Sequence, residues 1–324
     1  MTINNGVSYY TEDDLNKEEI FTDCLTISTR GEYSGTVTYH DEKFCLANNI
    51  LAMPMANYSK YSKLYIATLI QKLGYCGYSG YPRKETLKKD KILLPIRNNL
   101  IDFEYMEKFI NILEEERLQI LETYLQVNSL DNCQLTDAEQ LALDKITNKE
   151  IKFRQIKIEE LFNIATGRDF IIGKTKPGSM PLVSHTNTNN GIVGYVDPVI
   201  DRRIFKANKT ISLADRGVFF ATTQLFDFYI GTRVKALIFK NGEKTEAQRL
   251  FTTTSINKLQ VFFTEYLSNA TDKLPKLIIS LPVTDDNEID YDFMETYIKA
   301  IEKKVIQKVI TWKDSEMKTL KIVS

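Results

Sequence analysis

The sequence contains few of the residues on which metal sites and disulfide frameworks depend. It has two histidines and four cysteines, and no two cysteines form a Cys-x-x-Cys pair. The usual zinc spacings are therefore missing, and scattered cysteines are typical of reduced thiols in a cytosolic protein. No apolar run approaches the roughly 18 residues of a membrane span, and the first residues do not resemble a signal peptide. We expect a cytoplasmic protein that uses no membrane and no metal.

Recognisable catalytic and cofactor motifs are missing too. The segment GRDFIIGKT at 167–175 has five residues between its glycines, whereas a phosphate-binding loop has four, so the backbone cradle would be spoiled. His185 has no acid or nucleophile at a recognisable spacing. The sequence also lacks an Asn-Pro-Pro-Tyr-like methyl-transfer motif, a glycine-rich turn for a methyl donor and a metal-dependent nuclease set. We therefore expect no catalytic residue and no cofactor.

Charge is segregated along the chain although the net charge is only −1. Residues 43–97 carry ten Lys and Arg against two acids, and residues 152–276 carry nineteen against eleven. Between these basic blocks, residues 102–122 carry seven acids against two basic residues. This separation predicts two places that meet a polyanion and one that does not.

An internal repeat organises the chain. Residues 101–114 (IDFEYMEKFINILE) and 289–302 (IDYDFMETYIKAIE) share six of fourteen positions, and each copy follows a short apolar strand that ends in Leu-Pro. Two further matches occur at a similar offset: LTISTRG at 25–31 with TISLADRG at 210–217, and NNGVSYY at 4–10 with NNGIVGY at 189–195. The chain is therefore predicted to be two copies of one unit, each a β-rich region followed by a long helix.

Both copies end in a predicted amphipathic helix, over 101–125 and 289–313. The apolar residues follow a spacing of three and four: Phe103, Met106, Ile110, Leu113 and Leu121 in the first helix, and Met294, Ile298, Ile301, Val305 and Trp312 in the second. Because the first helix is acidic and the second is not, we predict that they pack antiparallel along most of their length, with Ile110 and Ile301 near the facing mid-points. The alternative is that each helix covers only its own sheet.

The regions before the helices alternate apolar and polar residues in short runs broken by Asn-Asn-Gly and similar turns, which indicates curved, loop-rich sheets. The predicted fold class is α+β, with two β-rich domains alternating with two long helices that pair as an antiparallel coiled coil. A helix of about 25 residues is about 37 Å long, close to one turn of B-DNA. Such a helix would space two DNA-binding domains for a split target.

The ordered repeat resembles the specificity subunits of bacterial type I restriction-modification systems. The resemblance spans nearly the whole chain and rests on Leu-Pro followed by Ile-Asp-Phe/Tyr, Met-Glu and a long helix, with YPRKETLKKDKILLP at 81–95 and IEELFNIATGRD at 158–169. It implies a non-catalytic subunit whose two target-recognition domains each read half of a bipartite double-stranded DNA site. The helices would dock methyltransferase subunits, and a motor-nuclease subunit can join. The complex would be a DNA adenine methyltransferase and endonuclease.

The resemblance divides the chain into four segments: a first target-recognition domain over 1–97, a spacer helix and connector over 98–150, a second target-recognition domain over 151–284 and a second spacer helix over 285–324. The first domain departs from the family pattern. About 36 residues, 153–188, precede Asn-Asn-Gly in the second domain, but three precede it in the first. A truncated gene, an upstream start and a partner chain that supplies the missing part each explain this difference.

Candidate DNA contacts in the second domain are of two kinds. The candidate base-reading residues are polar side chains with both donors and acceptors: Ser184, His185, Asn187, Asn189, Thr223 and Gln224. The candidate phosphate contacts are basic: Lys174, Lys176, Arg202 and Arg203. The plain alternatives are a solvated turn before a strand for 184–190, an ordinary exposed strand end for Thr223 and Gln224, which we favour slightly, and a solvated charged face for the basic residues.

In the first domain, basic residues are interleaved with tyrosines, a composition that suits contact with phosphates and sugars. The candidates are Tyr78, Arg83, Lys84 and Lys88. Two other functions stay open. The chain could be a fragment of a fused restriction-methylation enzyme, which catalytic motifs in the same reading frame would reveal. It could instead be a coiled-coil adaptor with no role in DNA binding, although the paired basic blocks argue against this.

Overall fold

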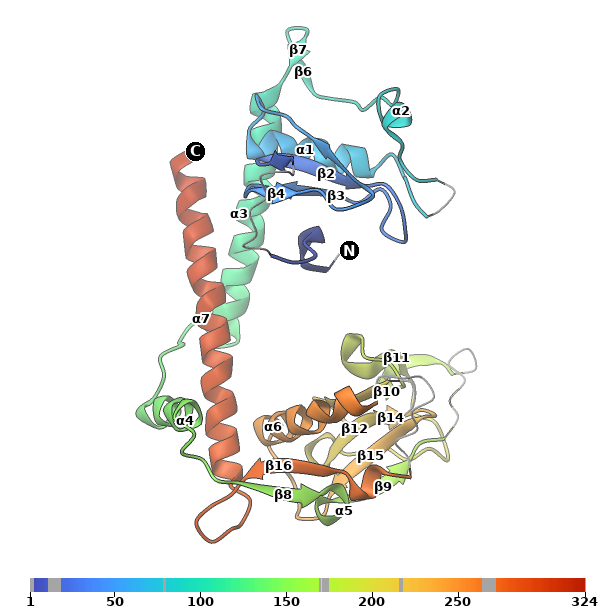
Figure 1. Cartoon of the computed structure of the whole chain (residues 1–324), viewed down its shortest axis with the longest axis vertical. Helices are drawn as coiled ribbons and strands as arrows, with labels where there is room; N and C mark the ends of the chain where they lie inside the picture. Colours follow the sequence, from blue (N-terminus) through green and yellow to red (C-terminus); the bar gives the residue numbers. More distant parts are fainter. Residues whose placement is uncertain are drawn as a thin grey trace. The chain divides into compact units, whose positions relative to one another are not determined.

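The computed structural model describes residues 3–10, 19–77, 80–168, 170, 175–215, 218–263 and 272–323, with side chains from residue 5 to residue 320 (Figure 1). The chain divides into two compact units, one made of residues 1–129 with 311–324 and the other of residues 130–310. Each unit combines a β-rich part with helix, so the predicted α+β class is confirmed.

The first unit is built from short strands and one covering helix ahead of a long helix. Its elements are η1 (Ile3–Gly6), β1 (Ile20–Phe21), β2 (Cys24–Ser28), β3 (Val37–His40), β4 (Phe44–Cys45), β5 (Ile50–Met53), α1 (Lys60–Gln71), α2 (Lys84–Leu87), β6 (Ile96–Arg97), β7 (Leu100–Ile101) and α3 (Phe103–Val127). The main sheet has the order β3-β2-β5 and is antiparallel. Its core joins Leu25 and Ile27 of β2 to Ile66 of α1 and Met106 of α3.

The second unit is larger. Its elements are α4 (Asp137–Thr147), β8 (Phe153–Lys157), α5 (Ile158–Leu161), β9 (Phe162–Thr166), β10 (Pro177–Val183), η3 (Asn189–Gly191), β11 (Ile192–Val196), η4 (Ala207–Lys209), β12 (Thr210–Asp215), β13 (Phe219–Thr223), β14 (Tyr229–Ile230), β15 (Val234–Phe239), α6 (Glu246–Asn257), η5 (Lys258–Phe262), η6 (Leu274–Lys276) and β16 (Ile278–Pro282). The long helix α7 (Tyr291–Val323) begins here and ends in the first unit.

The sheets of the second unit pack around several apolar clusters, the largest of which lies against the β13-β12-β15-β9 sheet. The larger sheet has the order β13-β12-β15-β9, while β10 lies between β11 and β14 in a second sheet and β16 pairs with β8. Buried residues from β8, α5 and β9 join the largest cluster: Ile156, Ile158, Leu161 and Phe162. The capping box of Thr245 and Gln248 begins α6, which satisfies the first free amides of a helix packed against β13.

The internal repeat is also present in the helix caps and in the strand pairing of the two units. Asp102 caps α3 by accepting from the Tyr105 amide over 3.0 Å, and Asp290 accepts from the Phe293 amide over 2.9 Å at the start of α7. In the central strands, Thr26 lies between Thr38 and Ala52, and Ser212 lies between Thr222 and Ala236. The two halves therefore share register as well as sequence.

The halves differ at one edge of the main sheet. In the second unit, β9 pairs with β15 along five residues, and β8 pairs with β16. Within the described residues, β5 has β2 as its sheet neighbour and 91–95, the counterpart of β16, forms no strand. The burial of the matching apolar residues differs accordingly: Leu237 on β15 is fully buried, whereas Met53 on β5 is half-buried.

The two long helices are 25 and 33 residues long, so the second continues beyond the predicted residue 313. Within the first unit, the end of α7 packs antiparallel to α3: Lys313 Nζ lies 3.4 Å from Glu122 Oε1, and Leu320 packs with Ile110 and Leu118. The prediction that Ile110 faces Ile301 is therefore wrong.

The predicted apolar stripes also need correction. Met106, Ile110, Leu118 and Leu125 are the buried residues of α3, whereas Leu113 is exposed. On α7, Met294 is buried, but Val305 and Trp312 are exposed. A spacing of three and four defines a face of a helix, and the neighbours of that face depend on the register of packing, which the spacing leaves open.

Candidate nucleic-acid interface

The predicted base-reading segment forms the loop between β10 and β11. The loop closes where the Ser184 amide donates to the Gly191 carbonyl over 2.9 Å. Asn189, Asn190 and Gly191 in its Asn-Asn-Gly turn have φ values of 47°, 52° and 79°. Asparagine is among the few non-glycine residues that adopt this left-handed conformation readily. The local sequence therefore dictates the tight turn on which the loop is built.

Side-chain amides fix this loop to the end of β13. Asn190 Nδ2 donates to the Thr223 carbonyl over 2.8 Å, and Gln224 Nε2 donates to the Asn190 carbonyl over 2.9 Å. Gln224 Nε2 also lies 3.0 Å from Thr222 Oγ1, while Arg249 donates to the Gln224 carbonyl over 2.8 Å. These bonds hold the loop in one position relative to the sheet, as a recognition loop requires.

The loop presents some polar side chains outward and uses others internally. His185 and Asn187 are exposed, and Ser184 Oγ lies 3.2 Å from His185 Nδ1. Asn189 instead bends back, with Nδ2 donating to the Ile192 carbonyl over 3.0 Å. His185 and Asn187 are therefore the loop residues best placed to meet an external partner.

Thr223 and Gln224 do not form the exposed strand end that we favoured. Their exposed fractions are 6% and 1%, and Thr223 Oγ1 lies 2.8 Å from Thr253 Oγ1 on α6. Their hydrogen-bonding groups are used within the domain, so these side chains position the loop and present no edge to a base.

Basic residues lie in the same domain, two of them against aromatic rings. The Arg202 Cζ lies 5.5 Å from the centroid of the Phe170 ring, and the Arg203 Cζ lies 4.9 Å from that of Phe205. Such cation–π contacts hold a guanidinium near the surface without neutralising its charge. Lys176, directly before β10, is exposed.

Lys206 belongs to an internal ion pair. Its Nζ lies 2.6 Å from Asp227 Oδ2. Burial alone would raise the pKa of Asp227, but hydrogen bonds from Lys206 and the Ala207 amide outweigh this and leave the pKa lowered. Because Asp227 stays charged and neutralises Lys206, this lysine is a weaker candidate for a phosphate contact than Arg203.

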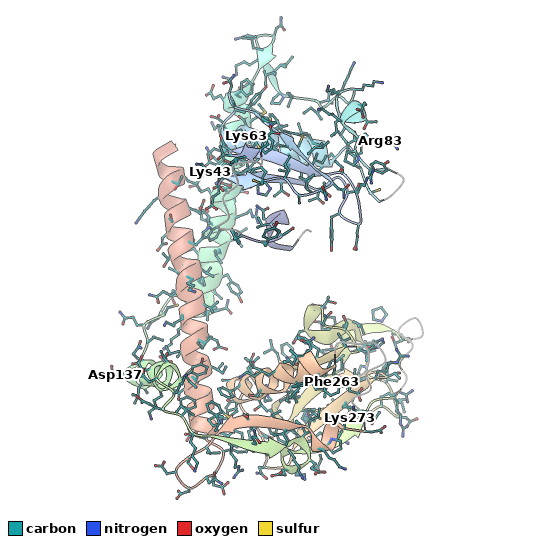
Figure 2. All side chains as sticks on the ribbon, viewed as in Figure 1. Lys43, Lys63, Arg83, Asp137, Phe263 and Lys273 are labelled. Atoms are coloured by element: carbon teal, nitrogen blue, oxygen red, sulfur yellow. The ribbon has the colours of Figure 1, made fainter. Side chains whose placement is uncertain are left out.

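The basic cluster of the first unit lies around α2. Arg83 Nη2 donates to the Tyr81 hydroxyl over 2.8 Å, and its Cζ lies 4.9 Å from the centroid of that ring. Figure 2 labels Arg83. Lys84, the first residue of α2, and Lys88, the residue that caps its C-terminus, are exposed. Two predicted contacts lie outside the described residues: Lys174 and Tyr78.

Two exposed arginines, Arg168 and Arg233, were not among the DNA contacts predicted from the sequence. They are 65 positions apart in the chain, and no local pattern relates them. Only the pairing of β9 with β15 brings them to the same edge of the sheet.

Comparison with known proteins identifies the class to which this geometry belongs. Residues 1–123 and 150–311 match the family described as type I restriction modification DNA specificity domain. The chain belongs to this family, which confirms the resemblance seen in the sequence. It is a DNA specificity subunit of the type I restriction-modification class.

Two individual proteins are similar to this chain, one in sequence and one in fold. The chain is 26% identical over 311 residues to the type II restriction enzyme BgcI specificity subunit S.BcgI of Heyndrickxia coagulans, covering 93% of this chain and 84% of the relative. The fold is similar to the crystal structure of a type I restriction-modification S subunit from M. genitalium, with a TM-score of 0.51 and 14% identity over 95% of this chain and 82% of that one.

In the part of the chain that the structure describes, no three side chains of His, Cys, Asp or Glu are grouped so that they could hold a metal ion. None of the helices described combines the length and the apolar content needed to cross a membrane. The four cysteines are free thiols.

Proposed function

We propose that this chain is the non-catalytic, cytoplasmic recognition subunit of a restriction-modification complex, and that each of its β-rich domains reads one half of a bipartite double-stranded DNA site. The observation that carries this proposal is the loop at 184–190. The Asn190–Gln224 hydrogen bond fixes its backbone, while His185 and Asn187 are exposed. A rigid loop with outward donors and acceptors is what reading base edges requires.

Within this loop, Asn187 is suited to adenine, because an amide can donate to N7 and accept from the exocyclic amine, and His185 can donate to or accept from a base edge. Ser184 and Asn189 support the loop from its two ends. Lys176, Arg202 and Arg203 would contact phosphates and so orient the domain. Arg83, Lys84 and Lys88 would serve the same purpose in the first domain.

The division into domains over 1–97 and 151–284, with spacers over 98–150 and 285–324, remains our proposal for how the two half-sites are assigned. Under it, the long helices set the distance between the half-sites. The length of α3, at 25 residues, supports a spacing near one turn of B-DNA, since such a helix is about 37 Å long.

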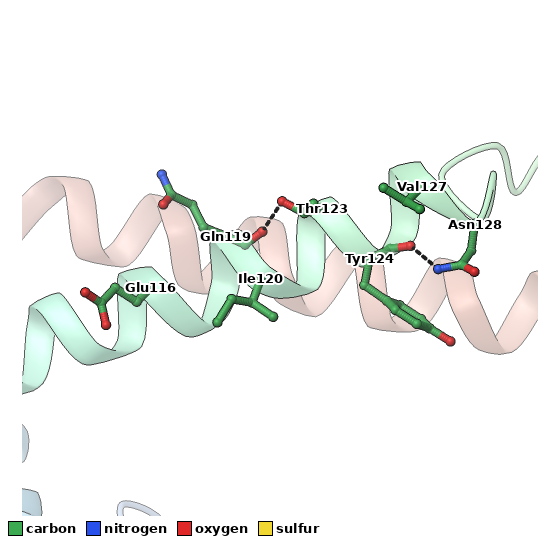
Figure 3. Close-up of a pocket in the computed structure, with 7 residues that line it drawn as sticks. All are labelled: Glu116, Gln119, Ile120, Thr123, Tyr124, Val127 and Asn128. Carbon is green, nitrogen blue, oxygen red and sulfur yellow. Dashed lines mark hydrogen bonds between the residues drawn. The ribbon is translucent and has the colours of Figure 1, made fainter. Parts of the chain in front are cut away.

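The long helix α3 carries the surface that we propose docks a methyltransferase subunit. An open groove along it is lined by Glu116, Gln119, Ile120, Thr123, Tyr124, Val127 and Asn128 (Figure 3). Ile120 and Val127 are 69% and 77% exposed, and Tyr124 is also exposed. An aromatic and two aliphatic side chains on one helix are typical anchors of a protein interface. A motor-nuclease subunit would then join the assembled complex.

Among the residues that the structure describes, no strand covers the edge of β5 that faces away from β2, and this open edge supports a further partner. Its counterpart β15 is covered by β9. We propose that another polypeptide supplies a strand like β9 to β5, because an open sheet edge with unpaired amides and carbonyls is a template for strand addition.

The function is tested by mapping methylated adenines in the host genome with the gene present and with it deleted. We expect one bipartite motif to lose its methylation on deletion. Methylation that persists at every motif would contradict the proposal. Methyl transfer to DNA by the purified chain alone would favour the fused-enzyme alternative, and failure of the intact chain to bind any duplex would favour a coiled-coil adaptor.

A further inference from the structure

Two arginines lie at the same end of the ladder between β9 and β15. Thr166 pairs with Lys235 in this antiparallel ladder, and the Gly167 amide donates to the Val234 carbonyl over 3.2 Å. Arg168 directly follows Gly167 and Arg233 directly precedes Val234, so both arginines lie at this end of the ladder. Both side chains are exposed. The end of this ladder therefore carries two exposed positive charges.

This charged pair lies beside the 184–190 loop. A β-carbon at Gly167 would lie 2.2 Å from the Gly231 carbonyl oxygen, so only glycine lets the chain before Arg168 approach this closely. The Gly231 amide in turn donates to the Val183 carbonyl over 2.8 Å, and Val183 directly precedes Ser184. One strand, β14, thus separates the arginines from the start of the loop.

The arrangement is unfavourable for the isolated domain. Two like charges at the same end of a ladder repel each other where no opposite charge compensates the repulsion. Arg233 also has a φ of 62°, which costs free energy for a residue with a long side chain, whereas the matching position in the first unit is Asn49 with a φ of 65°. Among the described residues, no carboxylate pairs with either arginine, and the nearby Asp215 lies 3.7 Å from Lys235 Nζ.

We propose that Arg168 and Arg233 together contact the phosphate backbone of the DNA strand whose bases the 184–190 loop reads. This inference rests on the proposed function and adds a site to it. A duplex phosphate relieves the repulsion between the two guanidinium groups, because each can donate paired N–H groups to phosphate oxygens. Contacts of this kind fix the register of a domain on DNA without reading its sequence.

The test uses the full-length chain and a fluorescent duplex of arbitrary sequence, with the dissociation constant measured across a range of salt concentrations. The double variant Arg168→Gln with Arg233→Asn removes both charges, and asparagine suits the left-handed backbone at 233. Because each phosphate contact contributes about 0.9 to the slope of log affinity against log salt, we expect the slope to decrease by about 1–2. Affinity for all sequences should fall alike.

The matched control is Lys273→Gln with Lys276→Gln, which removes the same charge. Both lysines are exposed, and Leu277, next to Lys276, accepts from the Ile158 amide near the other end of β9 (Figure 2 labels Lys273). We expect this control to leave the slope within a few tenths of the wild-type value. An equal decrease in both variants would overturn the proposal, because it would reflect net charge alone.

Two further outcomes are separable. If the wild-type chain binds with a salt-dependent affinity and the arginine double variant has the same slope, this inference is wrong while the proposed function stands. If the wild-type chain binds no duplex at any salt concentration, both are wrong. If the double variant melts at a lower temperature than the wild type, the single variant Arg168→Gln is measured instead, because Arg168 does not occupy the strained backbone position. This single variant should decrease the slope by about half as much.

Discussion

Gln224 and Asn190 are joined by a hydrogen bond of 2.9 Å from the side-chain amide of one to the carbonyl of the other. This bond ties the end of β13 to the Asn-Asn-Gly turn and so connects the core of the second unit with the loop proposed to read DNA. A residue that sequence reasoning placed at the surface thereby becomes the support of the recognition loop. Its effect on DNA preference is indirect.

Gln224→Leu should therefore loosen the loop without removing any DNA contact. The Asn190 carbonyl loses its donor in a partly buried place, and a hydrogen bond of this kind contributes about 0.5–1.5 kcal/mol. We expect denaturant unfolding to show this loss of stability, and binding to show weaker sequence preference with an unchanged salt slope. Asn187→Ala, in the same loop but exposed, should change stability by less than about 0.5 kcal/mol. Equal stability of Gln224→Leu and the wild type would contradict this assignment.

Ile120→Ser combined with Tyr124→Ser should release the methyltransferase subunit. Truncating one hot-spot anchor of a protein interface costs about 2 kcal/mol or more, which is about 30-fold in affinity, so the double variant should weaken binding by at least that factor. The measurement is co-purification and titration with the partner subunit. Lys108→Ser, an exposed change in the same helix, is the control and should retain the partner. Undiminished binding by the double serine variant would place the docking surface elsewhere.

Glu139 should make the contact between α4 and α7 sensitive to acid. Burial alone would raise its pKa, but Lys303, whose Nζ lies 2.7 Å from Glu139 Oε2, and Thr136 at the helix cap lower it overall. Because the pKa in the folded state is below the ordinary value of 4.5, the stabilisation is present above that pH and is lost as pH falls through the lowered pKa.

Glu139→Gln should consequently cost about 1.5–3 kcal/mol at neutral pH, the range for a hydrogen bond to a charged group. The difference in unfolding free energy from the wild type should shrink below pH 4. A difference that stays constant between pH 7 and pH 3 would show that the ion pair contributes nothing.

A synthetic peptide of residues 153–166, which contains β8, α5 and β9, should bind the open edge of β5. Hydrogen exchange of the intact chain should be faster in β5 than in β15, because open sheet edges are less protected. Adding the peptide should slow exchange in β5, and a scrambled peptide should not. Equal protection of β5 and β15 without peptide would show that the β5 edge is already covered.

The sequence supported the repeat, the two long helices and the Asn-Asn-Gly turns, because each depends on neighbouring residues. Asn190 and Asn5 adopt the same left-handed backbone, as the matched motifs predicted. Features that depend on distant pairing were missed. Neither the burial of Gln224 nor the register that places Leu320 beside Ile110 is encoded in a local pattern, since both arise from the way separate elements pack.

The residues of the candidate site also fall into two groups, those that a local sequence pattern predicts and those that only the pairing of distant strands brings together. His185 and Asn187 belong to a polar turn whose exposure follows from composition, so the sequence could identify them. Arg168 and Arg233 become neighbours only through the ladder of β9 and β15. Side-chain periodicity indicates which face of a strand is buried, but the choice of partner strand is a property of the whole sheet.

Selection of bound duplexes from a random pool by the intact complex tests the proposed reading of DNA most directly. The variant His185→Ala with Asn187→Ala should lose preference at one half of the bipartite motif, since each base contact discriminates by about 1–3 kcal/mol, while the other half and the spacing stay unchanged. Lys273→Gln with Lys276→Gln should select the wild-type motif. Recovery of the full wild-type motif by the His185 and Asn187 variant would contradict the assignment of the 184–190 loop as the reader of DNA sequence.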